Sequence, residues 1–311
     1  MIVTVTMNPA MDKTASVGVL IPGGLNRLEN VVLDAGGKGI NVSKMICALG
    51  GDSFATGFLG GGSGNEIERL LKKQGINTDF VTTANPTRTN LKVLSEAFGI
   101  TEFNEPGAAV SAAELDELKK KLASYASPET IFVFAGSLPP GMDTDITASL
   151  IAMVKENGAS VFLDADGEAF RAALSAKPDF IKPNKFELAQ YFGKDSDISL
   201  SECRELCRRL VAQGVTTVVL SMGAEGAMFV TVDETLFAPG IAVQARSTVG
   251  AGDSMVGAFV YAFRQGLEFK ECAALAVAAS AGAVITEGTK PPDRETVDEL
   301  LKRVRFDKLT E

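Results

Sequence analysis

The 311-residue sequence contains no histidine, and its only cysteines are Cys47, Cys203, Cys207 and Cys272. The absence of histidine excludes a histidine-based catalytic triad and a histidine-ligated zinc site. Acid–base chemistry near neutral pH must therefore depend on Asp, Glu, Lys, Cys or Tyr. The cysteines include no Cys-x-x-Cys pair, which favours free buried thiols in a reducing cytosol over a metal site.

The sequence also lacks an excess of positive charge and any apolar run long enough to cross a bilayer. Its formal net charge is −9. Nucleic acids and anionic membranes require a basic face, so neither is expected as a partner. A few local Arg and Lys residues can still hold an anionic substrate. The N-terminal segment MIVTVTMNPAMDK has no signal-peptide pattern, which predicts a cytoplasmic protein.

Hydrophobic residues make up 46% of the chain, enough for a large core. From residue 111 onward, predicted strands and helices alternate, which favours an α/β fold with a mostly parallel sheet and helices on both faces. Two segments, about 12–34 and 88–106, contain extra short strands outside this alternation. We expect them to form a small separate sheet that acts as a lid on a single domain spanning residues 1–311.

The segment STVGAGDS, residues 247–254, contains small residues followed by an acid and then by a helical apolar pattern. Gly250, Ala251 and Gly252 at a helix start leave backbone N–H groups open to an anion. Asp253 lies inside this cradle, where a carboxylate can take a proton from an attacking hydroxyl. An anion hole that contains a base favours phosphoryl transfer, although Asp253 as a simple helix cap remains an alternative.

A second glycine-rich segment, DAGGKGINV, covers residues 34–42. It lacks the earlier glycine and the Ser or Thr of a Walker A loop, so a nucleotide P-loop is not expected. Gly37, Lys38 and Asn41 are instead candidates for contacts with a small polar ligand, or the segment is a tight turn into a helix. The segment GFLGGGSG, residues 57–64, loosely matches a dinucleotide pattern and is interpreted as structural.

Charged residues near these segments are candidate substrate ligands. Asp12 follows the first predicted strand and can accept hydrogen bonds from sugar hydroxyls, or it is a turn residue. Arg27 and Arg88 lie at the edges of the two irregular segments, where a guanidinium can bind a phosphate in a bidentate manner. The alternative for each arginine is a solvated surface charge.

Further candidates lie at the ends of predicted strands, where parallel sheets bind ligands. In KPNKFEL, Asn184 and Glu187 can hold a hydrated magnesium ion or can cap a helix. In SMGAEGA, Ser221, Gly223 and Gly226 form a turn suited to a nucleotide phosphate or ribose. Other polar residues at such ends are Ser137, Asp164 and Lys182.

Together these motifs resemble the ribokinase-like (PfkB) carbohydrate kinases. The matching segments run in order along nearly the whole chain: NPAMD, AGGKGINV, GFLGG, TRTN, GSLPPG, KPNKFEL, SMGAEGA and VGAGDS. The resemblance implies a ribokinase-like three-layer sandwich with a small β-sheet lid. It also implies ATP-dependent, Mg²⁺-assisted phosphorylation of a sugar hydroxyl. The lid of this family often mediates dimers, so we expect a homodimer through the lid.

The same resemblance implies roles for individual residues. Asp253 would be the catalytic base, and Gly250, Ala251 and Gly252 would form the anion hole. Asn184 and Glu187 would organise Mg²⁺. The expected ATP contacts are Lys182, Asn184, Ser221, Gly223, Gly226 and Thr248. The expected sugar contacts are Asp12, Arg27, Gly37, Lys38, Asn41, Arg88, Asn90 and Ser137.

Within the family, NPAMDK, TRTNLKV and TEFNEPG resemble the 1-phosphofructokinases. The implied reaction is phosphorylation of D-fructose 1-phosphate to fructose 1,6-bisphosphate. Tagatose-6-phosphate kinase and 6-phosphofructokinase remain alternatives with the same chemistry. A dinucleotide-dependent oxidoreductase is disfavoured because no acid is placed to bind its ribose. A non-catalytic sugar-phosphate sensor is disfavoured because it has no use for Asp253.

Overall fold

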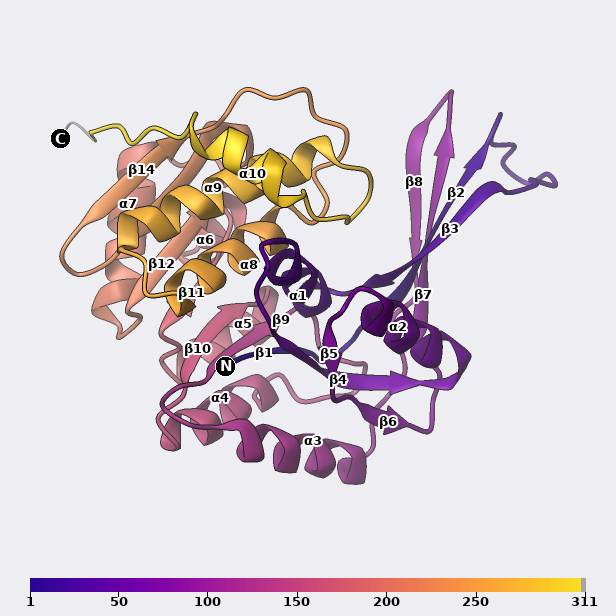
Figure 1. Ribbon diagram of the computed structural model, residues 1–311, viewed down its shortest axis with the longest axis horizontal. Helices are drawn as coiled ribbons and strands as arrows, with labels where there is room; N and C mark the ends of the chain where they lie inside the picture. Colours follow the sequence, from indigo (N-terminus) through magenta and orange to yellow (C-terminus); the bar gives the residue numbers. More distant parts are fainter. Residues whose placement is uncertain (309–311) are drawn as a thin grey trace.

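The computed structural model describes residues 1–308 and contains two β-sheets of different size (Figure 1). The larger sheet has the order β14-β13-β12-β11-β10-β9-β1-β4-β5, with β6 also paired to β4. Its pairings from β12 to β5 are parallel, and β13 and β14 add an antiparallel edge. Its strands are β1 (Ile2–Thr6), β4 (Phe54–Gly60), β5 (Asn77–Thr78), β6 (Val81–Thr83), β9 (Ile131–Ala135), β10 (Ser160–Asp164), β11 (Phe180–Ile181), β12 (Thr217–Ser221), β13 (Gly226–Val230) and β14 (Thr235–Pro239). The predicted mostly parallel sheet is confirmed.

Helices cover both faces of this sheet and bury two large apolar clusters. The helices are α1 (Lys38–Ala48), α2 (Gly61–Lys73), α3 (Ala112–Tyr125), α4 (Ile146–Glu156), α5 (Gly167–Leu174), α6 (Lys185–Tyr191), α7 (Leu200–Ala212), α8 (Ala251–Arg264), α9 (Phe269–Ile285) and α10 (Arg294–Leu301). Along β9, Phe132 and Phe134 enter the cluster under α3 to α7, whereas Ile131 and Val133 enter the cluster under α1 and α8 to α10. This alternation along one strand is what a three-layer sandwich requires.

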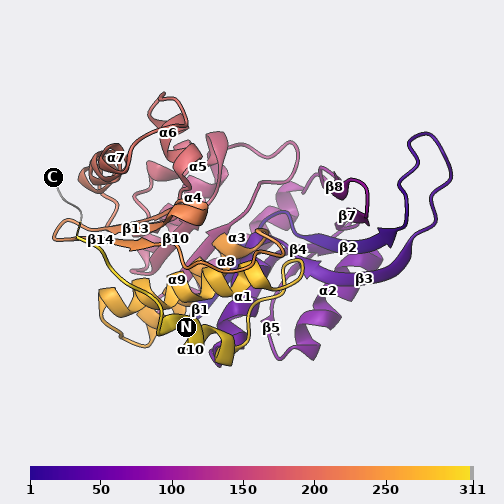
Figure 2. The same cartoon turned by 90° about the horizontal axis from the view of Figure 1, so that it is seen from above.

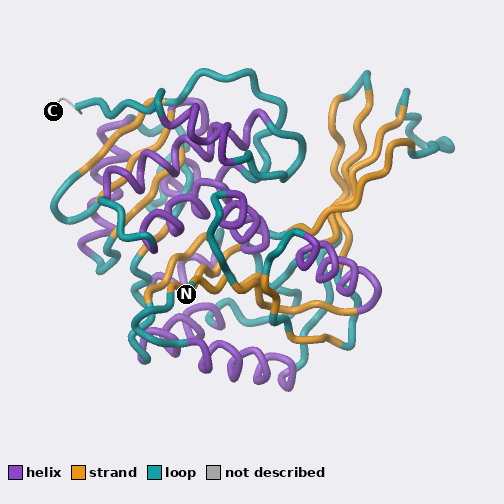
Figure 3. Tube along the Cα trace, in the orientation of Figure 1, coloured by secondary structure: helices purple, strands orange, loops and turns teal. Residues whose placement is uncertain are grey.

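The smaller sheet has the order β3-β2-β7-β8 and projects from the α/β body (Figures 1 and 2). Its strands are β2 (Ala10–Val17), β3 (Glu29–Gly36), β7 (Arg88–Ser95) and β8 (Gly99–Asn104). They come from the two segments that did not fit the βα alternation. Figure 3 shows these long strands rising beside the helical layers of the body. We refer to this four-stranded sheet as the lid sheet.

Two features of the fold bear on the sequence expectations. Asp12 lies inside β2 and not in a turn, and helix α2 begins at Gly61, within the glycine-rich segment of residues 57–64. A Cβ at Gly57 would lie 1.9 Å from the carbonyl oxygen of Thr6, so this glycine is needed for strand packing. Packing likewise explains Gly60 and Gly61, in line with the structural interpretation, whereas a Cβ at Gly62 would meet no atom within 4 Å. Within residues 1–308, no helix has the length and apolar character needed to cross a membrane.

Candidate active site

Polar side chains from the body and the lid sheet surround one cavity of about 320 Å³. The body contributes the ends of β1 and β9 and the starts of α1 and α8, and the strands β2, β7 and β8 contribute the opposite wall. The predicted site residues that line this cavity are Asp12, Gly37, Lys38, Asn41, Arg88, Asn90, Ser137, Gly250 and Asp253. Motifs that are far apart in the sequence thus meet in one place.

The start of helix α8 lies at the cavity, and its geometry suits an anion. Gly250 is its N-cap and adopts the left-handed conformation, with φ of 81°, that glycine adopts without strain. No side chain caps this helix, so its first N–H groups have no side-chain acceptor. An anion placed there would meet these donors and the positive end of the helix dipole.

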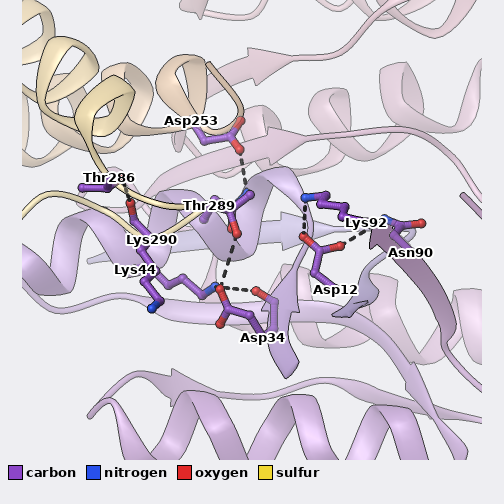
Figure 4. A network of polar contacts seen from close by, with 11 residues as sticks. Asp12, Asp34, Lys44, Asn90, Lys92, Asp253, Thr286, Thr289 and Lys290 are labelled. Carbon is purple, nitrogen blue, oxygen red and sulfur yellow. Dashed lines mark hydrogen bonds and ion pairs between the residues drawn. The ribbon is translucent and has the colours of Figure 1, made fainter. Parts of the chain in front are cut away.

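Asp253 lies in this first turn and is only 7% exposed. Its Oδ2 accepts a hydrogen bond from Asn41 Nδ2 of α1 at 2.8 Å, drawn as a dashed line in Figure 4. Burial, with a further contribution from the negative charge of Asp164, raises the pKa of Asp253 to about 6. A carboxylate with this pKa is mostly ionised at neutral pH and is still basic enough to accept a proton.

A buried ion network supports this wall of the cavity. Asp164, at the end of β10, lies 3.2 Å from Lys38 Nζ and 3.3 Å from Lys182 Nζ. Burial opposes its ionisation, but the two lysines outweigh this effect and hold the pKa of Asp164 below its usual value. Lys182 Nζ also lies 3.3 Å from the position that a Cβ at Gly252 would occupy. The network therefore brings positive charge to the start of α8.

On the opposite wall, two side chains of β7 hold the carboxylate of Asp12 (Figure 4). Asn90 Nδ2 donates to Oδ1 and Lys92 Nζ donates to Oδ2, each at 3.2 Å. Asn90 and Lys92 are two residues apart on one strand, so their side chains share a face. A Cβ at Gly36 would lie 2.6 Å from Asp12 Cγ, so β3 can approach this carboxylate only with glycine there.

Arg88, at the start of β7, is bound to the backbone around the cavity. Its Nε, Nη1 and Nη2 donate to the carbonyl oxygens of Pro9, Glu105 and Asn8 at 3.4, 2.9 and 3.0 Å. The guanidinium therefore braces the connection between β1 and β2 against the end of the lid sheet. This contact with three carbonyl groups was not predicted for Arg88.

A third group of contacts joins the base of the lid sheet to the body (Figure 4). Lys44 Nζ of α1 donates to Asp34 Oδ2 at 2.9 Å and also to the carbonyl oxygen of Ala35. Thr289 Oγ1 donates to the same oxygen of Asp34 at 3.4 Å. Thr289 lines the cavity, and its Cα would lie 3.5 Å from a Cβ at Gly250. The base of β3, helix α1 and the loop after α9 are thereby linked beside the start of α8.

Comparison with known proteins assigns this architecture to a family. The family model described as pfkB family carbohydrate kinase matches residues 4–296. The chain belongs to the PfkB family of carbohydrate kinases. It is therefore a sugar kinase, a phosphotransferase that acts on an alcohol group.

Named relatives of this PfkB kinase cover almost its whole length. A 1-phosphofructokinase of Vibrio cholerae is 34% identical and covers 99% of this chain and 97% of its own. A 1-phosphofructokinase of Haloferax volcanii is 38% identical, with 96% and 95% covered. The structure of phosphofructokinase-2 from Escherichia coli in complex with potassium aligns with a TM-score of 0.93 at 31% identity, covering 97% of this chain and 98% of its own.

The predicted nucleotide-binding residues of this kinase do not line the cavity between body and lid sheet. Asn184 and Ser221 form an isolated parallel bridge, so the KPN and SMG segments adjoin each other. Thr248 lines a neighbouring cavity of about 380 Å³ between β8 and the loop before α8. A Cβ at Gly226 would lie 2.1 Å from the carbonyl oxygen of Ala238, so this glycine is required by the fold.

The predicted Mg²⁺ ligands and the predicted phosphate ligand Arg27 have surroundings that differ from those expected. Asn184 and Glu187 form a capping box: Asn184 Oδ1 accepts from Glu187 N at 2.8 Å, and Glu187 Oε2 accepts from Asn184 N at 2.7 Å. The helix-cap alternative is therefore present in the structure, and it leaves Glu187 Oε1 without a protein donor within residues 1–308. Arg27 is exposed in the connection between β2 and β3 and does not line the cavity.

Several residues of the cavity lining were not assigned as ligands from the sequence. Lys92 lies two residues after Asn90 in a segment with predicted strands, so strand alternation places it on the same face. Others, such as Asn8, Asn104 and Thr289, lie in loops or at a strand end, where no periodic pattern indicates which way a side chain points.

Proposed function

We propose that this kinase transfers the γ-phosphoryl group of ATP to the 6-hydroxyl of D-fructose 1-phosphate, which gives ADP and fructose 1,6-bisphosphate. The observation that carries the proposal is the Asn41–Asp253 pair at the uncapped start of α8, facing a cavity with cations on its far wall. The relatives named 1-phosphofructokinase support the choice of sugar.

The reaction would proceed at the body wall. Asp253 takes the proton of the 6-hydroxyl while that oxygen attacks the γ-phosphorus and the bond to ADP breaks. The N–H groups of Gly250, Ala251 and Gly252 stabilise the negative charge on the transferred group. Lys182, beside Gly252, adds its positive charge to the same end.

The sugar would be held between the walls by hydrogen-bond acceptors that are already in place. Asn41 Oδ1 and Asn90 Oδ1 are buried and have no partner among residues 1–308. Buried amide oxygens without partners are costly, and sugar hydroxyls can satisfy both of them. Asp12, oriented by Asn90 and Lys92, supplies a charged acceptor beside them.

ATP would bind along the segments that carry Ser221, Gly223, Gly226 and Thr248, with Lys182 and Asn184 toward its phosphates. Within residues 1–308, no group of three or more acidic or cysteine side chains is placed to hold a metal ion directly. Mg²⁺ keeps several waters when it binds phosphates, so a hydrated ion on the nucleotide, near the free Oε1 of Glu187, fits these residues. The metal would neutralise phosphate charge during transfer.

The test is ATP-dependent ADP release with fructose 1-phosphate, fructose 6-phosphate and tagatose 6-phosphate in parallel, compared by kcat/KM. We expect a clear preference for fructose 1-phosphate. Fructose 6-phosphate is the main competitor, because a structure of Escherichia coli phosphofructokinase-2 in complex with fructose-6-phosphate aligns with a TM-score of 0.91. A preference for either 6-phosphate would overturn the substrate and retain the chemistry.

We also propose that two copies associate through the lid sheet. By register, Leu33, Lys13, Leu91 and Phe103 form one row across the four strands, and Leu33 and Phe103 are 44% and 54% exposed. Apolar side chains exposed along one row of a projecting sheet mark a protein interface. Light scattering should give a dimeric mass for the protein and a monomeric mass for Phe103→Glu. A monomeric mass for the unchanged protein would contradict the association.

A further inference from the structure

The substrate of the proposed function already carries a phosphate, and the cavity must compensate its charge. The cationic side chains of the cavity lining are Lys38, Arg88 and Lys92. Acidic side chains also line the cavity, so an anionic sugar requires a cation that is free to face it. On the basis of the proposed function, one of these three cations must recognise the phosphate of the sugar.

Lys38 belongs to the reacting end of the cavity. Its ammonium is paired with Asp164 at 3.2 Å, and it is close enough to Asp253 for their charges to shift each other's pKa. It also lies at the start of α1, within the body wall. A cation in this position serves the transferred phosphoryl group or the base, whereas the phosphate carried by the sugar lies away from the attacked hydroxyl.

Arg88 faces the cavity with its hydrogen bonds already directed to the backbone. Three of its nitrogens donate to carbonyl oxygens of Asn8, Pro9 and Glu105. A guanidinium has five N–H donors, and a bidentate grip on phosphate uses two of them in one plane. Two donors of Arg88 remain, one on each Nη, so it can assist in binding a phosphate. The three backbone bonds fix the plane of its guanidinium, so Arg88 presents these donors in one orientation, whereas a lysine ammonium can exchange its partner.

Lys92 differs from both. It lies in the middle of β7, is 8% exposed and makes one hydrogen bond within residues 1–308, to Asp12 Oδ2 at 3.2 Å. An ammonium has three donors, and charge-assisted bonds of this kind usually measure about 2.7–2.9 Å. Two donors of a buried cation are thus available at the cavity, and its one bond to protein is long.

We propose that Lys92 is the residue that selects a phosphorylated sugar. Its ammonium binds the phosphate that the sugar carries, while Asp12 turns to accept sugar hydroxyls. Asp253 on the body and Lys92 on the lid sheet occupy opposite walls. One substrate can therefore place its 6-hydroxyl at Asp253 and its phosphate at Lys92. Glu102 is exposed and lies directly across from Lys92 on β8. Its negative charge repels a phosphate, so a phosphate can bind at this wall only if the ammonium of Lys92 offsets that charge.

The test compares Lys92→Gln with Lys92→Arg and with Lys73→Gln. Lys73 is the control for the loss of one positive charge, because it is exposed on α2 and does not line the cavity. For Lys92→Gln we expect the KM for fructose 1-phosphate to rise roughly 10- to 100-fold, which corresponds to the free energy of a hydrogen bond to a charged group. The KM for ATP and kcat at saturation should change less than about threefold, Lys92→Arg should recover most of the affinity, and Lys73→Gln should match the unchanged protein.

Three outcomes would overturn the proposal. The first is recovery of sugar affinity in the Asp12→Asn/Lys92→Gln double variant, which would mean that Lys92 only neutralises Asp12. The second is a loss in kcat without a change in KM for the phosphosugar. The third is an equal rise in KM for D-fructose, which has no phosphate, measured as a slow alternative substrate.

The unchanged protein separates this failure from failure of the proposed function. If it prefers another ketose phosphate, the proposed reaction is wrong, and the same variants measured with that sugar still support or overturn the role of Lys92. If it prefers a sugar without phosphate, both the reaction and the role of Lys92 are overturned.

Discussion

The two walls of the cavity are built in different ways. The body wall places Asp253 and Asp164 in a buried network with Lys38 and Lys182, supported by helix α8 and by the ends of parallel strands. The lid wall holds Asp12 through contacts of similar length, both 3.2 Å, but the sheet that supplies them has largely exposed outer strands. Asp12 and Asp253 are both 7% exposed, so the walls differ in the packing that supports them and not in the burial of these two carboxylates.

The proposed function gives the two walls different tasks. A general base and an anion hole gain from fixed positions, which the packed helices and strand ends of the body would provide. Recognition of a sugar phosphate requires groups that can exchange protein partners for substrate, which the lid sheet would provide. Changes to the body wall should therefore act on kcat and its pH dependence, and changes to the lid wall should act on the KM for the sugar.

The largest effect is expected from Asp253→Asn on the body wall. The amide keeps the shape of the side chain but cannot take a proton, so kcat should fall roughly 10²- to 10⁴-fold. ATP affinity, measured by calorimetry, should stay close to that of the unchanged protein because the anion-binding N–H groups remain. A near-normal kcat would show that Asp253 is not the base. It would also contradict the assignment of catalysis to the body wall.

After Lys92→Gln, Arg88→Ala should give the next largest effect on the lid wall. The substitution removes positive potential and leaves the carbonyl oxygens of Asn8, Pro9 and Glu105 without their donor. We expect the KM for the sugar to rise roughly 10-fold and the free energy of unfolding to fall by about 1–3 kcal/mol. Steady-state kinetics and urea unfolding measure the two effects. A kcat loss as large as that of Asp253→Asn would mean that the walls do not divide their tasks.

Lys38→Met should shift the pH dependence of the reaction. The positive charge of Lys38 lowers the pKa of Asp253, so its removal should raise that pKa above its present value of about 6. The acid limb of kcat/KM should then move to higher pH, by on the order of one pH unit. Lys38→Arg keeps the charge and should leave the limb in place. A shift to lower pH would contradict the arrangement of charges on the body wall.

The sequence predicts the body wall better than the lid wall, for physical reasons. Asp253 and its glycines stand together in one segment, and a helix start imposes their geometry locally. The contact of Lys38 with Asp164 joins residues 126 positions apart, so it depends on the order of strands in the sheet. The contact of Lys92 with Asp12 depends on the register of β7 beside β2, and the carbonyl partners of Arg88 belong to loops without periodic patterns.

The last expected effect concerns stability and not turnover. It tests whether the body wall gives up stability in order to hold a base. The pKa of Asp253 is about 6 in the folded protein, against an ordinary value of 3.8. The folded state thus binds this proton more tightly than the unfolded state, and stability falls as pH rises between about 4 and 6. Asp253→Asn removes this cost, so it should raise the free energy of unfolding at pH 7 by on the order of 1–3 kcal/mol.

Urea unfolding at pH 7 and pH 4 measures this difference between the variant and the unchanged protein. The gain should be present at pH 7 and nearly absent at pH 4, where Asp253 is protonated in the folded state. Asp12→Asn on the lid wall is the control: it breaks an ion pair with Lys92, so it should lower stability at pH 7. An equal loss of unfolding free energy in both variants would show that the contacts of Asp253 stabilise the fold as those of Asp12 do. The ionised Asp253 would then not destabilise the folded protein.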